Sequence, residues 1–226
     1  GMDVAATDAD FVICKATEGL GFTDPFYENF AGQVLGSGKL LGFYHFARTN
    51  GATAEADAFV DAVQPYIGRC LLALDYEADA VDNGASWALE WLDRVTERTG
   101  VKPVIYMSKS VCRSDDWREV AGKYKLWAAQ YPNYFPGGWQ DDPWTDAYGF
   151  GAWDSPAIYQ YTSVGRISGY SGNLDLNKSY LTAEEWLEMQ GSEEDIMASK
   201  EEVVSGVVGY TNDDGMGFRL WSDELY

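Results

Sequence analysis

The sequence predicts an α/β fold built around a closed barrel of parallel strands. Short, almost continuous apolar runs alternate along the chain with amphipathic helical patterns, which is typical of a parallel sheet covered by helices. No glycine-rich phosphate-binding loop follows any of these runs, which argues against a nucleotide-binding open sheet. Polar and aromatic residues stand at many predicted strand ends, where the active site of a barrel lies, and they favour the barrel over the open sheet.

The individual elements follow from the apolar pattern and from the residues that end each run. Strands are expected at 11–16, 40–46, 70–77, 103–108, 126–131, 157–162 and 173–176. Helices are expected at 25–35, 52–63, 86–99, 115–124 and 183–189. Gly36 and Gly38 end the first helix and Gly100 ends the third, since glycine adopts the backbone conformations that terminate helices. Residues 132–155, rich in Gly, Pro, Asp and Trp, form a long loop.

The composition narrows the classes of function. The formal net charge is −20 and the chain contains one histidine, so its surface repels nucleic acid and anionic membranes. The three cysteines show no metal-ligand spacing, and Cys14 and Cys70 lie in apolar runs, so neither a metal nor another cofactor is expected. No membrane span and no signal peptide is expected, and Gly1 before Met2 suggests that the natural start lies upstream.

An eight-stranded barrel needs one strand more than these seven, and the missing strand is the first. Asp3 and Val4 resemble the start of a strand, but only six residues, 4–9, separate Asp3 from Asp10. A crossover between neighbouring parallel strands needs about a dozen residues or more. Residues 3–10 are therefore expected to form a loop or the remnant of a helix.

Residues 1–190 are expected to form the barrel, and residues 191–226 an acidic extension. The extension holds nine acidic residues against Lys200 and Arg219. A helix is expected at 194–203, and a hairpin at 207–211 and 218–221 around a turn at 212–215. Two interpretations remain open. The favoured one is a linker with the start of a further module; the other is a segment that docks on the barrel and fills the gap left by the absent strand.

The strongest functional signal is the pair of carboxylates in the stretch LDYE at 74–77. Residues i and i+2 of a strand share a face and lie roughly 6.5 Å apart along the chain, so Asp75 and Glu77 are expected to point together from the end of an apolar strand. Mutual repulsion and partial burial would raise one pKa. A protonated carboxyl group beside an ionised one is the pair that cleaves glycosidic bonds. The alternative is a salt-bridged or solvent-facing pair.

Other polar and aromatic residues stand at neighbouring strand ends. Asp175 closes the last predicted strand and is a candidate third carboxylate, with turn capping as the alternative. A lone histidine such as His45 is more often a structural hydrogen-bonding group than a base, and Lys15 and Glu18 can pair with each other or with the carboxylates. The remaining candidates, for a sugar groove or for the core, are Tyr106, Trp127, Gln130, Tyr131 and Gln160.

Ten short stretches occur in a characteristic order along residues 10 to about 187. They are DFVICKATEG at 10–19, TDP at 23–25, GFYHFAR at 42–48, AEAD at 54–57, LDYE at 74–77, TGVKPVIY at 99–106, LW at 126–127, AQY at 129–131, YQYTS at 159–163 and LDLN at 174–177. Each stretch is weak alone, and the ordered set is highly specific. Together they resemble glycoside hydrolase family 25, the Chalaropsis-type muramidases of bacteria and phages.

The resemblance implies an irregular TIM-like (β/α) barrel that hydrolyses the β-1,4 bond between N-acetylmuramic acid and N-acetylglucosamine. Glu77 would protonate the leaving oxygen, Asp75 would support the reacting sugar through its N-acetyl group, and Asp175 would complete the acidic cluster. The implied partner is bacterial peptidoglycan, without a cofactor, outside the cell or at the cell wall. The expected substrate contacts are Lys15, Glu18, His45, Tyr106, Trp127, Gln130, Tyr131 and Gln160.

One departure from the family pattern bears on activity. Members usually begin with a strand similar to GIDVS, whose aspartate enters the active site. The stretch GMDVA at 1–5 imitates these letters at the wrong distance from Phe11, so Asp3 is not given that role. We therefore expect weak or absent hydrolysis, with a non-catalytic glycan-binding protein on a degenerate barrel as the alternative. A chitinase-type barrel is disfavoured because LALDYE at 72–77 lacks the additional aspartates that precede the acid in those enzymes.

Overall fold

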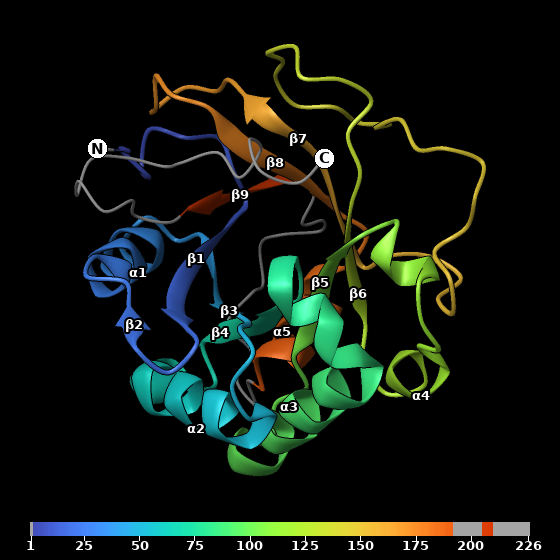
Figure 1. The fold of residues 1–226 in the computed structure, drawn as a ribbon. Coiled ribbons are helices and arrows are strands. Elements are labelled where there is room, and N and C mark those ends of the chain that lie inside the picture. The colour runs from blue at the N-terminus through green and yellow to red at the C-terminus, as the bar shows by residue number, and fades with distance from the viewer. Residues whose placement is uncertain (1, 192–204, 210–226) are drawn as a thin grey trace.

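The chain forms an eight-stranded barrel in the computed structural model, which describes residues 2–191 and 205–209 (Figure 1). The strands follow one another around the barrel in the order β1, β3, β4, β5, β6, β7, β8 and β9, and β9 pairs again with β1. The predicted α/β barrel is thereby confirmed. The strands are β1 (Phe11–Glu18), β2 (Phe22–Thr23), which adds to β1, β3 (Leu40–Phe46), β4 (Cys70–Asp75), β5 (Val104–Ser108), β6 (Leu126–Ala129), β7 (Ile158–Gly165), β8 (Leu174–Ser179) and β9 (Ser205–Gly209).

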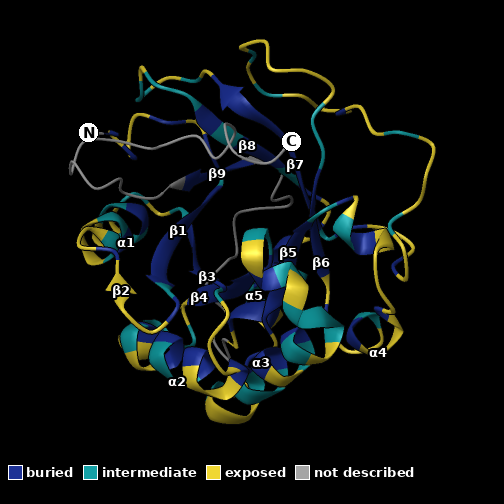
Figure 2. Cartoon of the chain, viewed as in Figure 1, coloured by how far each residue is buried: buried dark blue, intermediate teal, exposed yellow. Residues whose placement is uncertain are grey.

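Helices pack on the outside of the barrel with their outer faces exposed, while the barrel strands are largely buried and the short strand β2 is exposed (Figure 2). The five helices predicted between residues 25 and 189 are present, and α4 is shorter than predicted. Asp115 and Asp116 accept hydrogen bonds from the backbone N–H of Ala85 and Arg118 at 2.8 and 3.2 Å, so they form a turn before α4. The helices are α1 (Tyr27–Gly36), α2 (Ala52–Val63), α3 (Gly84–Thr99), α4 (Arg118–Ala121) and α5 (Ala183–Gln190), with 3-10 turns η1 (Gln64–Tyr66), η2 (Ala78–Asn83) and η3 (Val111–Arg113).

The strands alternate between two apolar layers, and this alternation decides which side chains reach the active site. In β4, Leu72 and Leu74 belong to the outer layer between barrel and helices. Leu71 and Ala73 belong to the layer inside the barrel. Because successive strand residues point to opposite faces, the next inward-facing residue of this apolar strand is Asp75.

Helix α5 closes the amino-terminal end of the barrel. Its Trp186 packs on Phe11, the first residue of β1, with ring centroids 4.6 Å apart. The side-chain amide of Gln190 donates to the backbone oxygen of Leu41 near the start of β3, at 3.4 Å. A capping box between Thr182 and Glu185 begins the helix. The opposite end of the barrel, where the strands finish, remains available for a site.

Strands β1, β3, β4, β5, β6 and β7 are parallel, as predicted, whereas β8 runs antiparallel to both β7 and β9, and the short β2 runs antiparallel to β1. Residues 166–173 connect β7 to β8, and this segment is too short for a crossover between parallel strands. The prediction of a fully parallel sheet from the alternation of strands and helices is therefore wrong for β8.

Strand β9 fills the place of the absent first strand. It pairs in parallel with β1, where Gly206 lies opposite Phe11 and Val208 opposite Ile13. It pairs in antiparallel with β8, where Val208 lies opposite Asp175. A Cβ atom on Gly206 would lie 2.0 Å from Cε2 of Phe11, so the absence of a side chain lets β9 approach β1. The barrel is closed, and of the two interpretations of residues 191–226, docking holds for residues 205–209.

Two further expectations concern the chain ends. Residues 2–10 form turns, as expected, with Val4 buried and the side chain of Asp3 exposed. The predicted hairpin strand that begins at Val207 is instead part of β9, because both of its edges are taken by β1 and β8. The predicted helix at 194–203 and the second hairpin strand at 218–221 lie outside the described residues.

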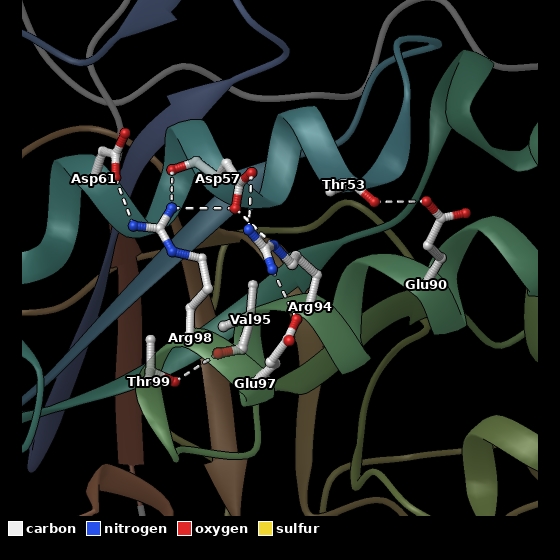
Figure 3. A network of polar contacts seen from close by, with 9 residues as sticks. All are labelled: Thr53, Asp57, Asp61, Glu90, Arg94, Val95, Glu97, Arg98 and Thr99. Carbon is white, nitrogen blue, oxygen red and sulfur yellow. Dashed lines mark hydrogen bonds and ion pairs between the residues drawn. The ribbon is translucent and has the colours of Figure 1, made fainter.

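An ion-pair network joins α2 to α3 on the outside of the barrel (Figure 3). Asp57 accepts hydrogen bonds from Arg94 at 2.8 Å and from Arg98 at 3.1 Å, and Arg98 also bonds Asp61 at 2.8 Å. These side chains are partly exposed, and surface ion pairs contribute at most about 1 kcal/mol each. The network fixes the relative placement of two helices and lies away from the strand ends that carry the site.

Candidate active site

A cavity of about 690 Å³ opens at the end of the barrel where the parallel strands finish and the antiparallel strand β8 begins. Side chains from β3, β4, β5, β6, β7, β8 and β9 reach it, together with residues of η2 and of the segments that follow β5 and β6. Eight of its lining residues are site residues predicted from the sequence. They are Asp75, Glu77, Tyr106, Trp127, Gln130, Tyr131, Gln160 and Asp175.

Asp75 and Glu77 lie on the same side of the chain, as predicted from their spacing. Strand β4 ends at Asp75 rather than at Glu77 as predicted, but the backbone of Glu77 is still extended, with φ −148° and ψ −170°. Tyr76 between them points outward, and its ring packs against Trp117 at 5.6 Å. Ala78 then turns the chain sharply with φ 52°, a left-handed conformation that is rare outside glycine.

The environment of these carboxyl groups favours their protonated form. Burial, followed by the charge of Glu77, raises the pKa of Asp75 well above its ordinary value. Burial also raises the pKa of Glu77 to about 7, although the nearby Lys15 ammonium opposes this shift. Asp75 Oδ1 is buried and makes no hydrogen bond with any residue that the structure describes. An unpaired, desolvated carboxyl group of this kind is suited to contact a ligand.

Asp175 joins the pair from β8. Burial, and then the charge of Glu77, raises its pKa to about 7. Its neighbour Asn177 donates to the backbone oxygen of Asp175 at 3.2 Å and accepts from the indole N–H of Trp127 at 2.8 Å. The three carboxyl groups therefore share one cavity, and burial, followed by the charge of Glu77 acting on Asp75 and Asp175, disfavours the ionised state of all three at once.

Aromatic rings and one amide form the floor beside the carboxyl groups. The rings of Tyr106 and Trp127 meet edge to face with centroids 4.8 Å apart. Gln160 donates to the hydroxyl of Tyr106 at 3.4 Å and to that of Tyr131. The ring of Tyr131 in turn contacts that of Tyr134, at 6.2 Å. Flat rings held in fixed positions give the cavity apolar faces on which a sugar ring can stack.

Three predicted substrate contacts do not reach the cavity wall. Lys15 and Glu18 pair with each other, and Glu18 also accepts from Arg48 at 2.8 Å. The Lys15 ammonium lies over the ring of Phe46, 4.8 Å from its centroid. Neither residue lines the cavity, but the positive charge of Lys15 lowers the pKa values of Asp75 and Glu77 and so partly opposes the effect of burial.

His45 is the third of these residues, and it is fully buried. Its Nε2–H donates to Glu55 at 2.8 Å, and its Nδ1 accepts from the hydroxyl of Thr17 at 2.8 Å. Glu55 also accepts from the backbone N–H groups of Arg48 and Asn50, both at 3.0 Å. Burial lowers the pKa of the imidazole, so a neutral His45 anchors the loop that follows β3, which agrees with the structural alternative given above.

Sequence patterns did not reveal several residues of the cavity wall. Lys109 and Ser110 follow β5, and Tyr134 lies in the long loop 132–155. Val208 of β9 is 6% exposed and faces the cavity opposite Asp175. The strand in the position of the absent first strand thus presents an apolar side chain to the site. Segments between strands have no periodic pattern that would mark Lys109, Ser110 or Tyr134, and the weak pattern of β9 did not mark Val208.

A closed α/β barrel with three carboxyl groups and fixed aromatic rings at its strand ends is the architecture of a barrel glycoside hydrolase. The model of the family "Glycosyl hydrolases family 25" matches residues 3–170, and the chain belongs to this family. The resemblance noted in the sequence is therefore confirmed.

Relatives of the chain include lysozymes and a muramidase. The chain is 28% identical over 178 residues to the autolytic lysozyme of Clostridium acetobutylicum, covering 77% of this chain and 50% of that protein. It is 30% identical over 192 residues to lysozyme M1 of Streptomyces globisporus, covering 77% and 61%. It is 32% identical over 171 residues to the N,O-diacetylmuramidase of Chalaropsis sp., covering 63% and 80%. The chain thus spans between a half and two thirds of the length of the two bacterial proteins.

Solved structures share the fold. The bacterial lysozyme from Streptomyces coelicolor matches with a TM-score of 0.69 at 24% identity, over 84% of this chain and 91% of that chain. The catalytic domain of the endolysin ply40 from bacteriophage P40 of Listeria monocytogenes matches with a TM-score of 0.62 at 26% identity, over 82% and 88%. Among the described residues, no helix is long and apolar enough to cross a membrane.

Proposed function

We propose that the protein hydrolyses the β-1,4 bond between N-acetylmuramic acid and N-acetylglucosamine in bacterial peptidoglycan. The observation that carries the proposal is the convergence of Asp75, Glu77 and Asp175 in one cavity with aromatic walls. Membership of family 25 and the names of the relatives support the choice of substrate. Because the proposed substrate is a polymer of the cell wall, we expect the protein to act outside the cell or at the wall.

In this mechanism Glu77 is the general acid. A pKa of about 7 leaves much of its carboxyl group protonated at neutral pH, so it can transfer its proton to the glycosidic oxygen as the bond to the anomeric carbon breaks. A water molecule then supplies the hydroxyl group of the new reducing end, and its other proton returns to the carboxyl cluster. The leaving sugar departs as an alcohol, and the proton returned from water restores the protonation state in which the cycle began.

Asp75 and Asp175 act on the sugar that bears the developing positive charge. Asp75 holds an unpaired buried oxygen that can contact the N-acetyl group of that sugar. Asp175 lies across the cavity on β8, and an ionised carboxylate there stabilises an oxocarbenium-like transition state. Tyr106, Tyr131, Trp127 and Gln160 form the surface against which the sugar lies.

The proposed activity is lower than that of a family member with an aspartate on the first strand. In this chain the corresponding strand is β9, and it presents Val208 to the site. The cluster of Asp75, Glu77 and Asp175 therefore has no carboxyl group from the strand between β8 and β1, although Asp82 of η2 also lines the cavity. The alternative function, a glycan-binding protein without catalysis, is favoured by the same observation and predicts binding without any cleavage.

The decisive experiment is the substitution Glu77→Gln, which removes the acidic proton and preserves size. We expect the clearing of purified cell walls, and the release of new reducing ends, to fall by about 10²–10⁴-fold. Glu119→Gln on exposed α4 is the matched control and should clear walls as the unsubstituted protein does. Binding of a peptidoglycan tetrasaccharide with no cleavage by the unsubstituted protein would establish the alternative function instead.

A further inference from the structure

Lys109 is a buried cation on the wall of the cavity, and its ammonium group donates hydrogen bonds to the loop 132–155. The side chain is 2% exposed. Its ammonium donates to Thr145 Oγ1 at 2.8 Å, to the backbone oxygen of Asp146 at 3.0 Å and to Asp146 Oδ1 at 2.5 Å. An ammonium group has three hydrogens, so the loop 132–155 uses every one of them. Lys109 is therefore placed to hold the loop rather than to bind substrate directly.

Asp146 completes the attachment by holding a second residue of the cavity wall. Its Oδ2 accepts from the side-chain amide of Gln130 at 2.7 Å, and its backbone N–H donates to Gln130 Oε1 at 3.2 Å. The hydrogen bonds from Lys109 and Gln130 lower the pKa of Asp146 to about 2. One ionised side chain thus joins the segments that follow β5 and β6, and Gln130 has both ends of its amide committed to the loop.

The residues joined in this way are close to the aromatic wall. The backbone N–H of Lys109 donates to Ala129 at 2.9 Å, and that of Gln130 donates to Gln160 at 3.1 Å. Gln130 is followed by Tyr131, whose ring contacts Tyr134 in the loop. The carboxyl groups of the site come instead from β4 and β8, and neither Lys109 nor Asp146 touches them through any hydrogen bond that the structure shows within its described residues.

We propose that Lys109 and Asp146 are positioning residues that fix the wall formed by Gln130, Tyr131 and Tyr134, and so set the affinity of the cavity for the sugar chain on that side. The inference rests on the proposed glycan-cleaving function. It assigns the pair to substrate binding and not to bond cleavage, because the wall is tied to β5 and β6 while the carboxyl groups stand on other strands. If the pair only stabilised the loop, its loss would lower the stability of the protein but would not raise KM while leaving kcat unchanged.

The test is a steady-state comparison on a soluble peptidoglycan tetrasaccharide. The variants are Asp146→Asn, which removes the charge at constant size, Lys109→Met, and the two combined. We expect KM to rise about tenfold while kcat stays within about twofold, the pattern that follows the loss of uniform binding. The double variant should resemble either single variant, because both substitutions break the same interaction. Lys109→Arg, which keeps the charge and the donors, should restore part of the affinity.

Controls separate this outcome from others. Lys123→Met and Asp93→Asn break an exposed ion pair of 3.0 Å outside the cavity and should leave both constants unchanged. An unchanged KM in Asp146→Asn, or an equal fall in kcat with KM unchanged, would overturn the positioning role while the unsubstituted protein still cleaves. If the unsubstituted protein neither cleaves nor binds the tetrasaccharide, the proposed function fails and the positioning role fails with it.

Discussion

At the scale of single residues, the site depends on how burial acts on charged groups. A carboxyl group in water has a pKa near 4, and removing it from water disfavours the ionised form. Glu77 and Asp175 share this effect, and each also acts on its neighbours through its charge. The same physical cause that makes these groups costly to bury makes a proton available at neutral pH, where an ordinary glutamate would have lost it.

This argument predicts an alkaline limb in the pH–rate profile. As general acid, Glu77 must be protonated, and its pKa is about 7. The rate of cleavage should therefore fall as the pH rises above about 7, approaching tenfold per pH unit. Initial rates on the soluble tetrasaccharide from pH 5 to 9 measure the limb. A rate that stays constant up to pH 9 would show that another group, or Glu77 with a much higher pKa, donates the proton.

A second prediction at this scale concerns Val208. The variant Val208→Asp adds a carboxyl group to the cavity wall, opposite Asp175 on the neighbouring strand. We expect the rate of wall clearing to rise several-fold, because a further acid adds negative charge near the developing cation.

The isosteric variant Val208→Asn provides the control for polarity without charge. It should clear walls no faster than the unsubstituted protein. A rise in both variants would indicate a packing effect, and no rise in Val208→Asp, with folding retained, would show that position 208 does not limit the reaction.

At the scale of elements, β9 contributes more to the fold than its five residues suggest. Without it, β1 and β8 would each expose an unpaired edge, and the barrel would open. Its close approach to β1 depends on Gly206. We predict that Gly206→Ala destabilises the protein by about 2–4 kcal/mol, because the added Cβ atom would overlap the ring of Phe11 in a packed interior.

Thermal unfolding provides the measurement, and Gly32→Ala provides the matched control. Gly32 lies in helix α1, and an added Cβ there meets no atom within 4 Å, so this variant should be unchanged or slightly more stable. Equal melting temperatures for Gly206→Ala and the unsubstituted protein would mean that β9 does not lie between β1 and β8 in solution.

The elements also show which parts of the structure the sequence could predict. Strands such as β3 and helices such as α2 follow from local periodicity, and their predicted bounds are those observed. The direction of β8 follows from the short connection 166–173, a signal that the strand pattern alone concealed. The place of β9 was left open, because SGVVG at 205–209 is a weak pattern whose partners lie far away in the sequence.

The candidate site shows the same division between local and distant signals. Asp75 and Glu77 were predictable because two residues of one strand share a face. Asp175 was predicted at the carboxyl end of a parallel strand, whereas it lies near the start of β8 and reaches the site because that strand runs antiparallel. Lys109 and Asp146 were not predictable, since they meet across 37 residues within a loop that has no periodicity. Their partnership depends on tertiary packing alone.

At the scale of the whole molecule, the carboxyl groups of the site and the net charge of −20 both lower the free energy of unfolding as the pH rises. Glu77 and Asp175 have pKa values of about 7 when folded and about 4 when unfolded. Between these values the folded protein holds protons that the unfolded chain has released, so the free energy of unfolding falls as the pH rises from about 4 to 7. Mutual repulsion of the excess acidic groups weakens the compact state over the same range.

We therefore predict a melting temperature that is highest at mildly acidic pH and lower at pH 8. Asp175→Asn removes one buried ionisation and should stabilise the protein at pH 8 by about 1–3 kcal/mol, while at pH 4 it should have little effect. Added salt should recover the part of the loss that comes from surface repulsion, and it should act equally on Asp175→Asn and on the unsubstituted protein. Glu119→Gln, which changes the same charge on the surface, separates the two contributions. A stabilisation by Asp175→Asn that is independent of pH would show that the pKa of this carboxyl group does not differ between the folded and unfolded states, contrary to the raised value on which the prediction rests.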